Sequence, residues 1–405
     1  MTHTCSAHGT ARSDGAAAPV LKFGVEEEFL LVDPATRTTS PRAHLVVPHA
    51  ARTLGARAQH EFLATQVEAC TRPVTSAAGL LAELVAARRA MGAAAEYAGC
   101  RLVATGTPVL PSRHPLSVTP TDRYQRVALH VNRAADQRGG EICGCHVHLG
   151  DLDRTEALAI SAHLRPWLPV LQALSVNSPF CEGRDNGAAS ARAGRYLAWP
   201  TCGPAPALDP DGYERTVERL LARRVILDRR MLYWYARPSE HLPTLEVRIA
   251  DTNADVTTPL LLAVLLRALA RTFLSAHRHG EPPPRMPGAV LREAHRQAAL
   301  GGLTGTGTHP STGCRLPMPV LVGDLLDLAT PALAGSGDLE LARPLVHARL
   351  TAGTGADRQR AVFAHRRALT DVVDDLAQRT ADPGTVAAPS VATGTGRPGS
   401  KAVIV

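Results

Sequence analysis

The chain has 405 residues, of which 45% are hydrophobic and only 4% are aromatic. This is enough apolar material for one large domain or two closely packed lobes. The net charge of +7 suits anionic ligands such as nucleotides, but the basic residues are spread along the chain without interleaved aromatics, which argues against nucleic-acid binding.

The first third of the chain predicts strands at its start and one long helix. Residues 1–19 are rich in Ala, Gly, Ser and Thr and predict a disordered leader. Alternating apolar residues predict strands over residues 21–33 and 62–70. Apolar side chains recur at helical spacing over residues 76–98, which predicts a helix, and a short strand is expected over residues 102–106.

The middle of the chain continues this alternation of strands and helices. A strand bounded by glycines is predicted over residues 141–149, and a helix over residues 154–176. Pro166 and Pro169 lie inside that helix, so we expect it to kink or break there, because proline lacks the amide hydrogen that a helix interior uses. A further helix is expected over residues 213–221.

The last third begins with a strand over residues 243–250 and an apolar helix over residues 257–277. Arg267 and Arg271 interrupt the apolar run, which indicates a buried amphipathic helix and not a membrane span. Residues 278–319 are rich in Gly and Pro and predict loops with short helices. The remaining predicted elements are two helices and a disordered tail, at residues 339–350, 357–378 and 381–405.

The cysteine pattern indicates the cellular compartment. The eight cysteines include no CxxC pair, and the first residues lack the apolar core of a signal peptide. The sequence therefore predicts a cytoplasmic protein with reduced thiols and no membrane association. Cys143 and Cys145 stand beside His146 and His148, so a structural zinc site is an alternative at this one place.

Four of the predicted strands carry polar side chains in pairs on one face. Side chains alternate between the two faces of a strand, so Glu26 and Glu28 share one face while Glu27 lies on the apolar one and has no evident role. Two neighbouring carboxylates repel each other and usually face solvent or a cation. The other strands carry similar pairs: Gln66 with Glu68, His146 with His148, and Glu246 with Arg248.

These paired residues together predict a common cleft lined by Glu, His and Arg. Carboxylate oxygens suit Mg²⁺ or Mn²⁺ better than zinc. A cation cluster beside Arg248, whose guanidinium offers a planar fork of donors, is what phosphoryl transfer requires. The structural alternatives are an exposed edge strand for Glu26 and Glu28 and a simple strand ion pair for Glu246 and Arg248.

Five segments of the sequence resemble the glutamate–cysteine ligase type 2 family, also called carboxylate–amine ligases. The segments are FGVEEEFLLVD, CGCHVHLGD, LQALSVNSPFCEGRDNGAASAR, YWYARPSEHLPTLEVRIADT and ADRQRAVF…LTDVVDDL. They run in order from about residue 21 to 380, and the family is similar in turn to glutamine synthetase. The resemblance implies an α+β fold over residues 20–380, a glutamine-synthetase-like catalytic domain. In such a domain a curved, mainly antiparallel sheet lines an ATP and metal cleft, and helices pack on its outer face.

The resemblance also implies roles for individual residues. The implied ligands of Mg²⁺ or Mn²⁺ are Glu26, Glu28, Glu68, His146 and Glu246, with Glu61 a weaker candidate. The implied contacts to ATP phosphates are His148, Arg248 and Arg192. The implied catalytic residues are Arg248, Arg192 and Arg237. The implied substrate contacts are Asn177, Ser178, Arg184 and Arg237.

The implied reaction has two steps and small-molecule partners. ATP would phosphorylate a carboxylate to an acyl phosphate, and an amine would then displace phosphate. The family resemblance further suggests a homo-oligomer. The sequence departs from the family where an aromatic-rich DTGYASYR-like loop is usual, since residues 185–192 read DNGAASAR. It departs again after Gly106-Thr107, where Pro108-Val109 replaces His-Pro, and at Tyr235, where an acidic residue is common.

These departures concern the substrate pocket, so three functions are compared. The first is a carboxylate–amine ligase with weak glutamate–cysteine ligase activity. The second is an amide-forming ligase of specialised metabolism with a carboxylate other than glutamate. The third is a non-catalytic ligand-binding homologue, against which Glu26, Glu28, His146, Glu246 and Arg248 are all present.

Overall fold

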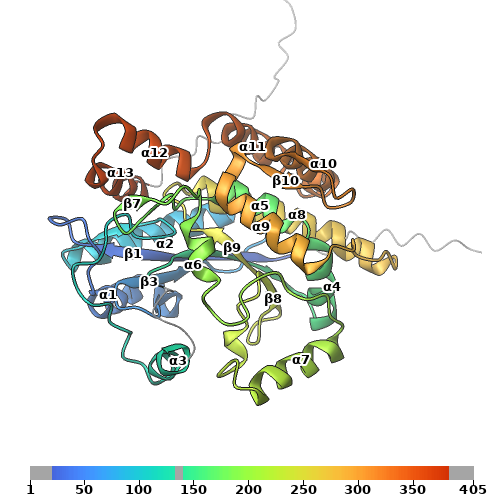
Figure 1. Cartoon of the computed structure of the whole chain (residues 1–405), viewed down its shortest axis with the longest axis horizontal. Coiled ribbons are helices and arrows are strands. Elements are labelled where there is room, and N and C mark those ends of the chain that lie inside the picture. Colours follow the sequence, from blue (N-terminus) through green and yellow to red (C-terminus); the bar gives the residue numbers. More distant parts are fainter. Residues whose placement is uncertain (1–20, 133–139, 383–405) are drawn as a thin grey trace, which may run out of the picture.

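Seven strands hydrogen-bond into one sheet through the middle of the molecule (Figure 1). Their order is β2-β3-β1-β5-β9-β8, with β4 also paired to β1, and every pairing is antiparallel. The strands are β1 (Phe23–Val32), β2 (Ala58–His60), β3 (Gln66–Cys70), β4 (Arg101–Val103), β5 (Gly144–Gly150), β8 (Ala236–Pro238) and β9 (Thr244–Asp251).

The computed structural model describes residues 21–132 and 140–382. The predicted leader, residues 1–19, lies outside the described residues, as does all of the predicted tail beyond residue 382. Both remain predictions from composition.

One face of the sheet is apolar because alternate residues of its central strands are apolar. Phe23, Val25 and Phe29 of β1 are almost completely buried on this face. Helix α8 (Thr257–Arg278) packs across β1 and β5, while α4 (Arg154–Leu164) and α5 (Leu168–Ser175) pack against β9. Each large apolar side chain buried here contributes about 1.5–3 kcal/mol. The predicted fold class, an α+β fold with a mainly antiparallel sheet and helices on its outer face, is confirmed.

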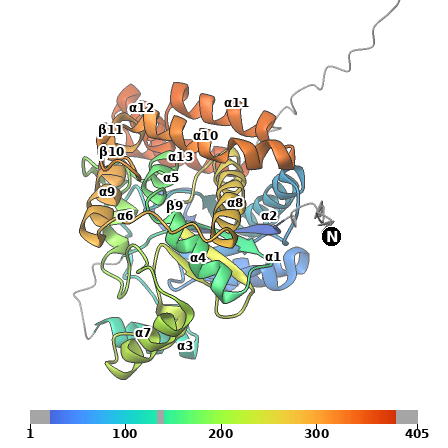
Figure 2. The ribbon, with the colours of Figure 1, turned by 90° about the vertical axis from the view of Figure 1, so that its right-hand side faces the viewer.

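The other helices surround this core in two groups. In both views, α10 to α13 lie together on one side of the sheet, and α3 and α7 lie on the opposite side (Figures 1 and 2). The bounds of the remaining helices are α1 (Ala43–Leu54), α2 (Ala77–Tyr97), α3 (Asp122–Asn132), α6 (Ala191–Tyr196), α7 (Pro210–Ala222), α9 (Gly288–Gly301), α10 (Met318–Ser336), α11 (Leu339–Ala352), α12 (Gly355–Arg366) and α13 (Leu369–Ala381). Two short hairpins complete the fold: β6 (Phe180–Cys181) with β7 (Arg184–Asp185), and β10 (Thr306–Thr308) with β11 (Arg315–Pro317).

Glu27 forms a buried ion pair beneath the sheet. Both its oxygens accept hydrogen bonds from Arg88 of α2, at 2.6 Å from Nη2 and 2.9 Å from Nε. Arg88 is 0% exposed and also donates to the backbone carbonyls of Asn253 and Ala254, each at 2.7 Å. Burial alone would lower the pKa of Arg88, but the Glu27 carboxylate outweighs it and raises that pKa. The glutamate without an evident role therefore ties β1 to α2 and to the end of β9.

Several helices differ from the sequence-based expectation. The break at the two prolines is present, since α4 ends at Leu164 and α5 begins at Leu168. The Gly- and Pro-rich residues 278–319, however, contain the whole of α9, whose Leu291 and Ala298 face the core. The helix predicted over residues 357–378 is two helices, because Arg367 adopts a left-handed conformation with φ 57°. Helices α1, α3 and α10 were not predicted.

Within residues 21–132 and 140–382, two helices, α8 and α10, are long and apolar enough to cross a membrane by length and composition alone. In α8, 78% of the most apolar window is buried, as predicted for a core helix. In α10 the corresponding share is 33%. Leu321 and Leu325 of α10 are fully buried in the same core as Leu265 of α8, so α10 forms a second layer over that helix.

Candidate active site

The polar face of the sheet brings the predicted residues of four strands together. Strand register places Glu26 opposite His146, Glu28 opposite Glu68, and His148 opposite Glu246. They line a cavity of about 310 Å³ that is bounded on the far side by residues of α3 and by the segment between α6 and β8. The sequence-predicted residues that line it are Glu26, Glu28, Glu68, His146, His148, Arg192, Arg237, Glu246 and Arg248, together with the weaker candidate Glu61.

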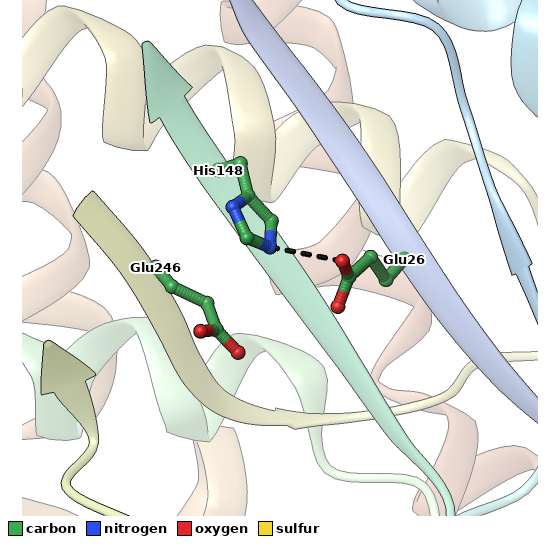
Figure 3. A group of neighbouring side chains, drawn as sticks. All are labelled: Glu26, His148 and Glu246. Atoms are coloured by element: carbon green, nitrogen blue, oxygen red, sulfur yellow. Dashed lines mark ion pairs between the residues drawn. The ribbon is translucent and has the colours of Figure 1, made fainter. Parts of the chain in front are cut away.

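A first group of candidate cation ligands consists of Glu26, His148 and Glu246. Their ligand atoms all lie within 4.8 Å of one another, and Figure 3 shows them extending from β1, β5 and β9 toward a common space. His148 Nε2 lies 3.2 Å from Glu26 Oε1. Burial would raise the pKa of Glu26, but hydrogen bonds from both histidines outweigh it and hold that pKa well below its usual range. The group is therefore charged and compact.

A second group consists of Glu28, Glu61 and Glu68, whose oxygens also lie within 4.8 Å of one another. Burial, followed by the charge of Glu28, raises the pKa of Glu61 to about 8. Burial and the same crowding of carboxylates raise the pKa of Glu68 well above its usual range. The Tyr124 hydroxyl donates to Glu61 Oε2 at 3.1 Å. Three carboxylates so close together repel one another unless protons or a cation neutralise them.

His146 lies between the two groups. Its Nδ1 is 3.3 Å from Glu26 Oε2, and its Nε2 is 3.6 Å from Glu28 Oε1. Burial and the charge of Arg248 lower the pKa of His146, which leaves the imidazole neutral and able to offer a lone pair. Its buried Nε2 has no hydrogen-bond partner among the residues that the structure describes.

These observations fit a divalent cation. A buried unpartnered imidazole nitrogen and clustered carboxylates whose pKa values are raised by mutual repulsion are both satisfied by a bound cation. The donors are mostly oxygens, which suits Mg²⁺ or Mn²⁺. The structure adds His148 to the candidate ligands and places Glu61, the weaker candidate from the sequence, among them. None of the predicted roles is tested by the geometry alone.

The arginines of the cleft are fixed by different partners. Arg248 ion-pairs with Glu246, and its Nε donates to the Tyr196 hydroxyl at 3.0 Å. Arg248 shares the polar face of β9 with Glu246 because side chains alternate along the strand, and a register shift gives β9 an extra residue opposite His146. Arg237 donates to Glu246 at 3.0 Å and to the backbone carbonyls of Arg230 and Leu232. Burial would raise the pKa of Glu246, but Arg237 and Arg248 outweigh it and hold it well below its usual range.

Arg192 lines the cleft, and its Nη2 donates to the Arg248 carbonyl at 3.4 Å. It is 2% exposed, stacks over the Tyr196 ring at 5.0 Å and has no partner for its Nε among the described residues. Asp251 lies behind it, 4.0 Å from Nη1. Asp251 also accepts hydrogen bonds from the Ser178 and Ser190 hydroxyls at 2.7 and 2.8 Å. These buried hydrogen bonds to Asp251 fix the start of α6 and therefore the position of Arg192.

Three predicted substrate residues do not line the cleft. Asn177 and Ser178 are almost completely buried, and Asn177 donates to the carbonyls of Ala104 and Thr252. Both therefore brace the loop before α6. Arg184 is exposed in the β6–β7 hairpin, away from the cleft lining. Their contact with substrate remains a prediction, and the structure gives the first two a bracing position.

The structure also adds cleft residues that the sequence did not single out. Among them are Arg123, Tyr124, Trp199 and Tyr233. Tyr124 and Arg123 come from α3, a helix that was not predicted. An isolated tyrosine or arginine on an unpredicted helix gives no sequence signal, so folding alone brings these side chains to the cleft.

Comparison with known proteins matches nearly the whole chain to a single family. The model of the glutamate–cysteine ligase family 2 (GCS2) matches residues 22–378. A protein of Salinispora arenicola named "Putative glutamate–cysteine ligase 2" is 40% identical over 371 residues, covering 91% of this chain and 97% of that protein. One of Mycolicibacterium vanbaalenii, named "Putative glutamate–cysteine ligase 2-2", is 39% identical over 89% of this chain and 98% of its own length.

Solved structures share the fold at low sequence identity. A glutamate–cysteine ligase from Francisella tularensis, solved in complex with AMP, superimposes with a TM-score of 0.65 at 11% identity, covering 89% of each chain. A bifunctional glutathione synthetase from Pasteurella multocida gives 0.63 at 16% identity, covering 90% of this chain and 52% of that one. At these identities the likeness concerns the fold.

Proposed function

Because the chain belongs to the glutamate–cysteine ligase family 2, we propose that it is an ATP- and divalent-cation-dependent ligase that joins a carboxylate to an amine through an acyl phosphate. The observation that supports this most directly is that the two clusters of candidate cation ligands line the same cavity as Arg192 and Arg248. The Francisella ligase, which has this fold and was solved with AMP, supports a nucleotide in the cleft.

In this proposal the side chains of the cleft have two roles in phosphoryl transfer, cation binding and phosphate binding. A bound Mg²⁺ or Mn²⁺ neutralises phosphate charge. Glu26, His148 and Glu246 on one side, and Glu28, Glu61 and Glu68 on the other, would hold the cations, with His146 between the two groups. Arg248 and Arg192 point guanidinium donors toward the phosphate oxygens, where charge is redistributed during transfer. Their rigid partners, Glu246, Tyr196 and Asp251, keep these donors in place before substrate arrives.

We consider two candidates for the carboxylate substrate, glutamate and a different carboxylate. We propose weak glutamate–cysteine ligase activity first, since the relatives bear that name. The alternative is a carboxylate other than glutamate, favoured by the departure of residues 185–192, which end at Arg192 of the cleft, from the aromatic-rich loop of the family. A cytoplasmic location and a homo-oligomer stay predictions.

The first test measures phosphate release from ATP with Mg²⁺. We expect release only when a carboxylate and an amine are both supplied, with glutamate and cysteine as the first pair and other amino acids and small carboxylates as the screen. Mass spectrometry of the amide product identifies the pair. Absence of release with every pair, together with no Mg-ATP binding by calorimetry, would contradict the ligase proposal.

Magnesium alone should stabilise the protein. The crowded carboxylates Glu28, Glu61 and Glu68 repel one another without a cation. At about 100 times its Kd, a ligand of the folded state adds about 2.7 kcal/mol, which raises Tm by about 5 °C at roughly 2 °C per kcal/mol. We expect Glu61→Gln to reduce this shift by more than half, and Glu96→Gln, an exposed change on α2, to leave it intact. Equal shifts in both variants would remove Glu61 from the cation site.

A further inference from the structure

A second cavity of about 260 Å³ lies on the other side of α6 from the cleft. Arg192, Tyr196 and Trp199 face the cleft, whereas Ala191, Gly194 and Leu197 line the second cavity. Its opposite wall is α9, which packs against α6 and α5 (Figures 1 and 2). The side chains from α9 that line it are Arg292, His295, Arg296, Ala299 and Leu300.

The walls of this cavity are small and apolar. Ala188, Ala191, Ala193 and Gly194 end at or before Cβ and leave the space open. Leu197 and Leu300 at the rim are 57% and 44% exposed. At roughly 30 Å³ of liquid volume per water molecule, the cavity accommodates a ligand on the order of ten non-hydrogen atoms. Apolar walls of this kind bind an apolar or aromatic body.

One buried polar atom in the cavity wall has no partner. His295 is 3% exposed, and its Nδ1 donates to Gln172 Oε1 at 2.6 Å, while Gln172 Nε2 donates back to the His295 carbonyl at 3.4 Å. Burial lowers the pKa of His295 to about 3, so the ring is neutral. With its proton on Nδ1, the ring leaves Nε2 as an acceptor, and Nε2 has no partner among the described residues. A ligand or a water molecule that donates a hydrogen bond would satisfy this atom.

The mouth of the cavity carries an unpaired positive charge. Arg292 is exposed and has no ion pair with any residue in the part of the chain that the structure describes. It stands one helical turn before His295 on the same face of α9. Arg296 is also at the mouth, but Glu293 pairs with it. Arg292 can therefore bind an anionic group at the rim while the deeper wall holds an apolar body.

We propose that this cavity is a second ligand site, separate from the catalytic cleft, for a small aryl carboxylate that carries a hydroxyl or amino group opposite its carboxylate. The donor group meets His295 Nε2, the ring lies between α6 and α9 against the Tyr235 side, and the carboxylate pairs with Arg292. The Tyr235 ring contacts His295 in a tilted arrangement, with ring centroids 4.4 Å apart and planes at 55°, which adds aromatic surface to the wall. The proposal does not depend on the ligase activity, since binding needs neither ATP nor metal.

Calorimetry and ligand-observed NMR with 4-hydroxybenzoate and 4-aminobenzoate test this site. We expect both probes to bind, and benzoate, which lacks the donor, to bind about tenfold more weakly or less, because Nε2 is then left unpaired. His295→Phe should abolish the difference between benzoate and the other probes. Arg292→Gln should weaken all three.

Gly194→Leu tests the site most directly, because it places a side chain inside the second cavity. A Cβ at Gly194 meets no atom within 4 Å, and leucine is a better helix former than glycine, so the variant is expected to fold while its side chain fills the cavity. We expect it to lose at least tenfold in probe affinity. Gly92→Leu, the same change in α2 where a Cβ also meets no atom, should leave affinity unchanged. Glu246→Gln, in the cleft, should keep it within about threefold, since it does not touch this cavity.

The proposal is overturned if neither donor-bearing probe binds, if benzoate binds as tightly as they do, or if Gly194→Leu leaves affinity unchanged. It is also overturned if Glu246→Gln removes binding, because the probes would then occupy the catalytic cleft. Failure of the ligase assay leaves these outcomes untouched.

Discussion

Arg88→Met is expected to lower the free energy of unfolding by about 3–5 kcal/mol, because it leaves the Glu27 carboxylate charged and unpaired in the core. Arg88 is 0% exposed and Glu27 is 2% exposed, so water cannot replace the lost partner. The carbonyls of Asn253 and Ala254 lose their donors at the same time. Urea denaturation followed by tryptophan fluorescence measures the change.

Two variants separate the ion pair from a general effect on α2. Arg89→Met makes the same substitution at the next, exposed position and should change stability by less than about 0.5 kcal/mol. Glu27→Leu combined with Arg88→Met removes both charges and should recover part of the loss. A loss below about 1 kcal/mol for Arg88→Met alone would show that Glu27 finds another partner.

Glu246→Gln is expected to reduce the rate of ATP-dependent phosphate release by about 10²–10³-fold. The substitution keeps the shape of the side chain and removes the charge that both Arg237 and Arg248 use. It also takes one carboxylate from the group that contains Glu26 and His148. The guanidinium of Arg248 then loses the partner that aims it, and the cation site loses a ligand. Steady-state kinetics with the substrate pair from the screen measures kcat.

Glu240→Gln is the matched control. Glu240 also forms ion pairs with two arginines, Arg154 and Arg229, but it lies outside the cleft lining. We expect less than about a threefold change in kcat for it. The Tm of both variants must be recorded, so that lost activity is not unfolding. Activity of Glu246→Gln within tenfold of the unchanged protein would remove Glu246 from the proposed catalytic machinery.

The polar face of the sheet could be predicted from the sequence because alternation along a strand is local. Glu26 and Glu28, or His146 and His148, share a face whatever the rest of the chain does. Antiparallel pairing then places these strands side by side. This pairing was expected from the family resemblance, because the local pattern alone does not predict which strands are neighbours. The separate position of Glu27 followed from the same alternation, but its partner Arg88 lies 61 residues away on α2 and no local signal connects them.

What could not be predicted depends on tertiary contacts. Glu61 was only a weaker candidate from the sequence; it directly follows β2, and its place in the cleft depends on Tyr124 of α3, which donates to it. The end of α12 falls at Arg367, a non-glycine residue in the left-handed region, so neither Gly nor Pro marks it. Asn177 and Ser178 are polar residues in a loop, a pattern typical of substrate contacts. The buried carboxylate of Asp251 instead accepts from the backbone amide of Asn177 and the hydroxyl of Ser178.

The three successive glutamates of β1 place an unusual demand on the length of that strand. Glu26 and Glu28 serve the cleft, and Glu27 serves the core. Loss or gain of a single residue just ahead of them would exchange the two faces, so that two carboxylates enter the apolar layer, where Arg88 can pair with one, and a single carboxylate remains in the cleft. No single substitution elsewhere restores the original faces of β1 after such a one-residue shift. Natural variation in this segment should therefore consist of replacements, while insertions and deletions are eliminated by selection.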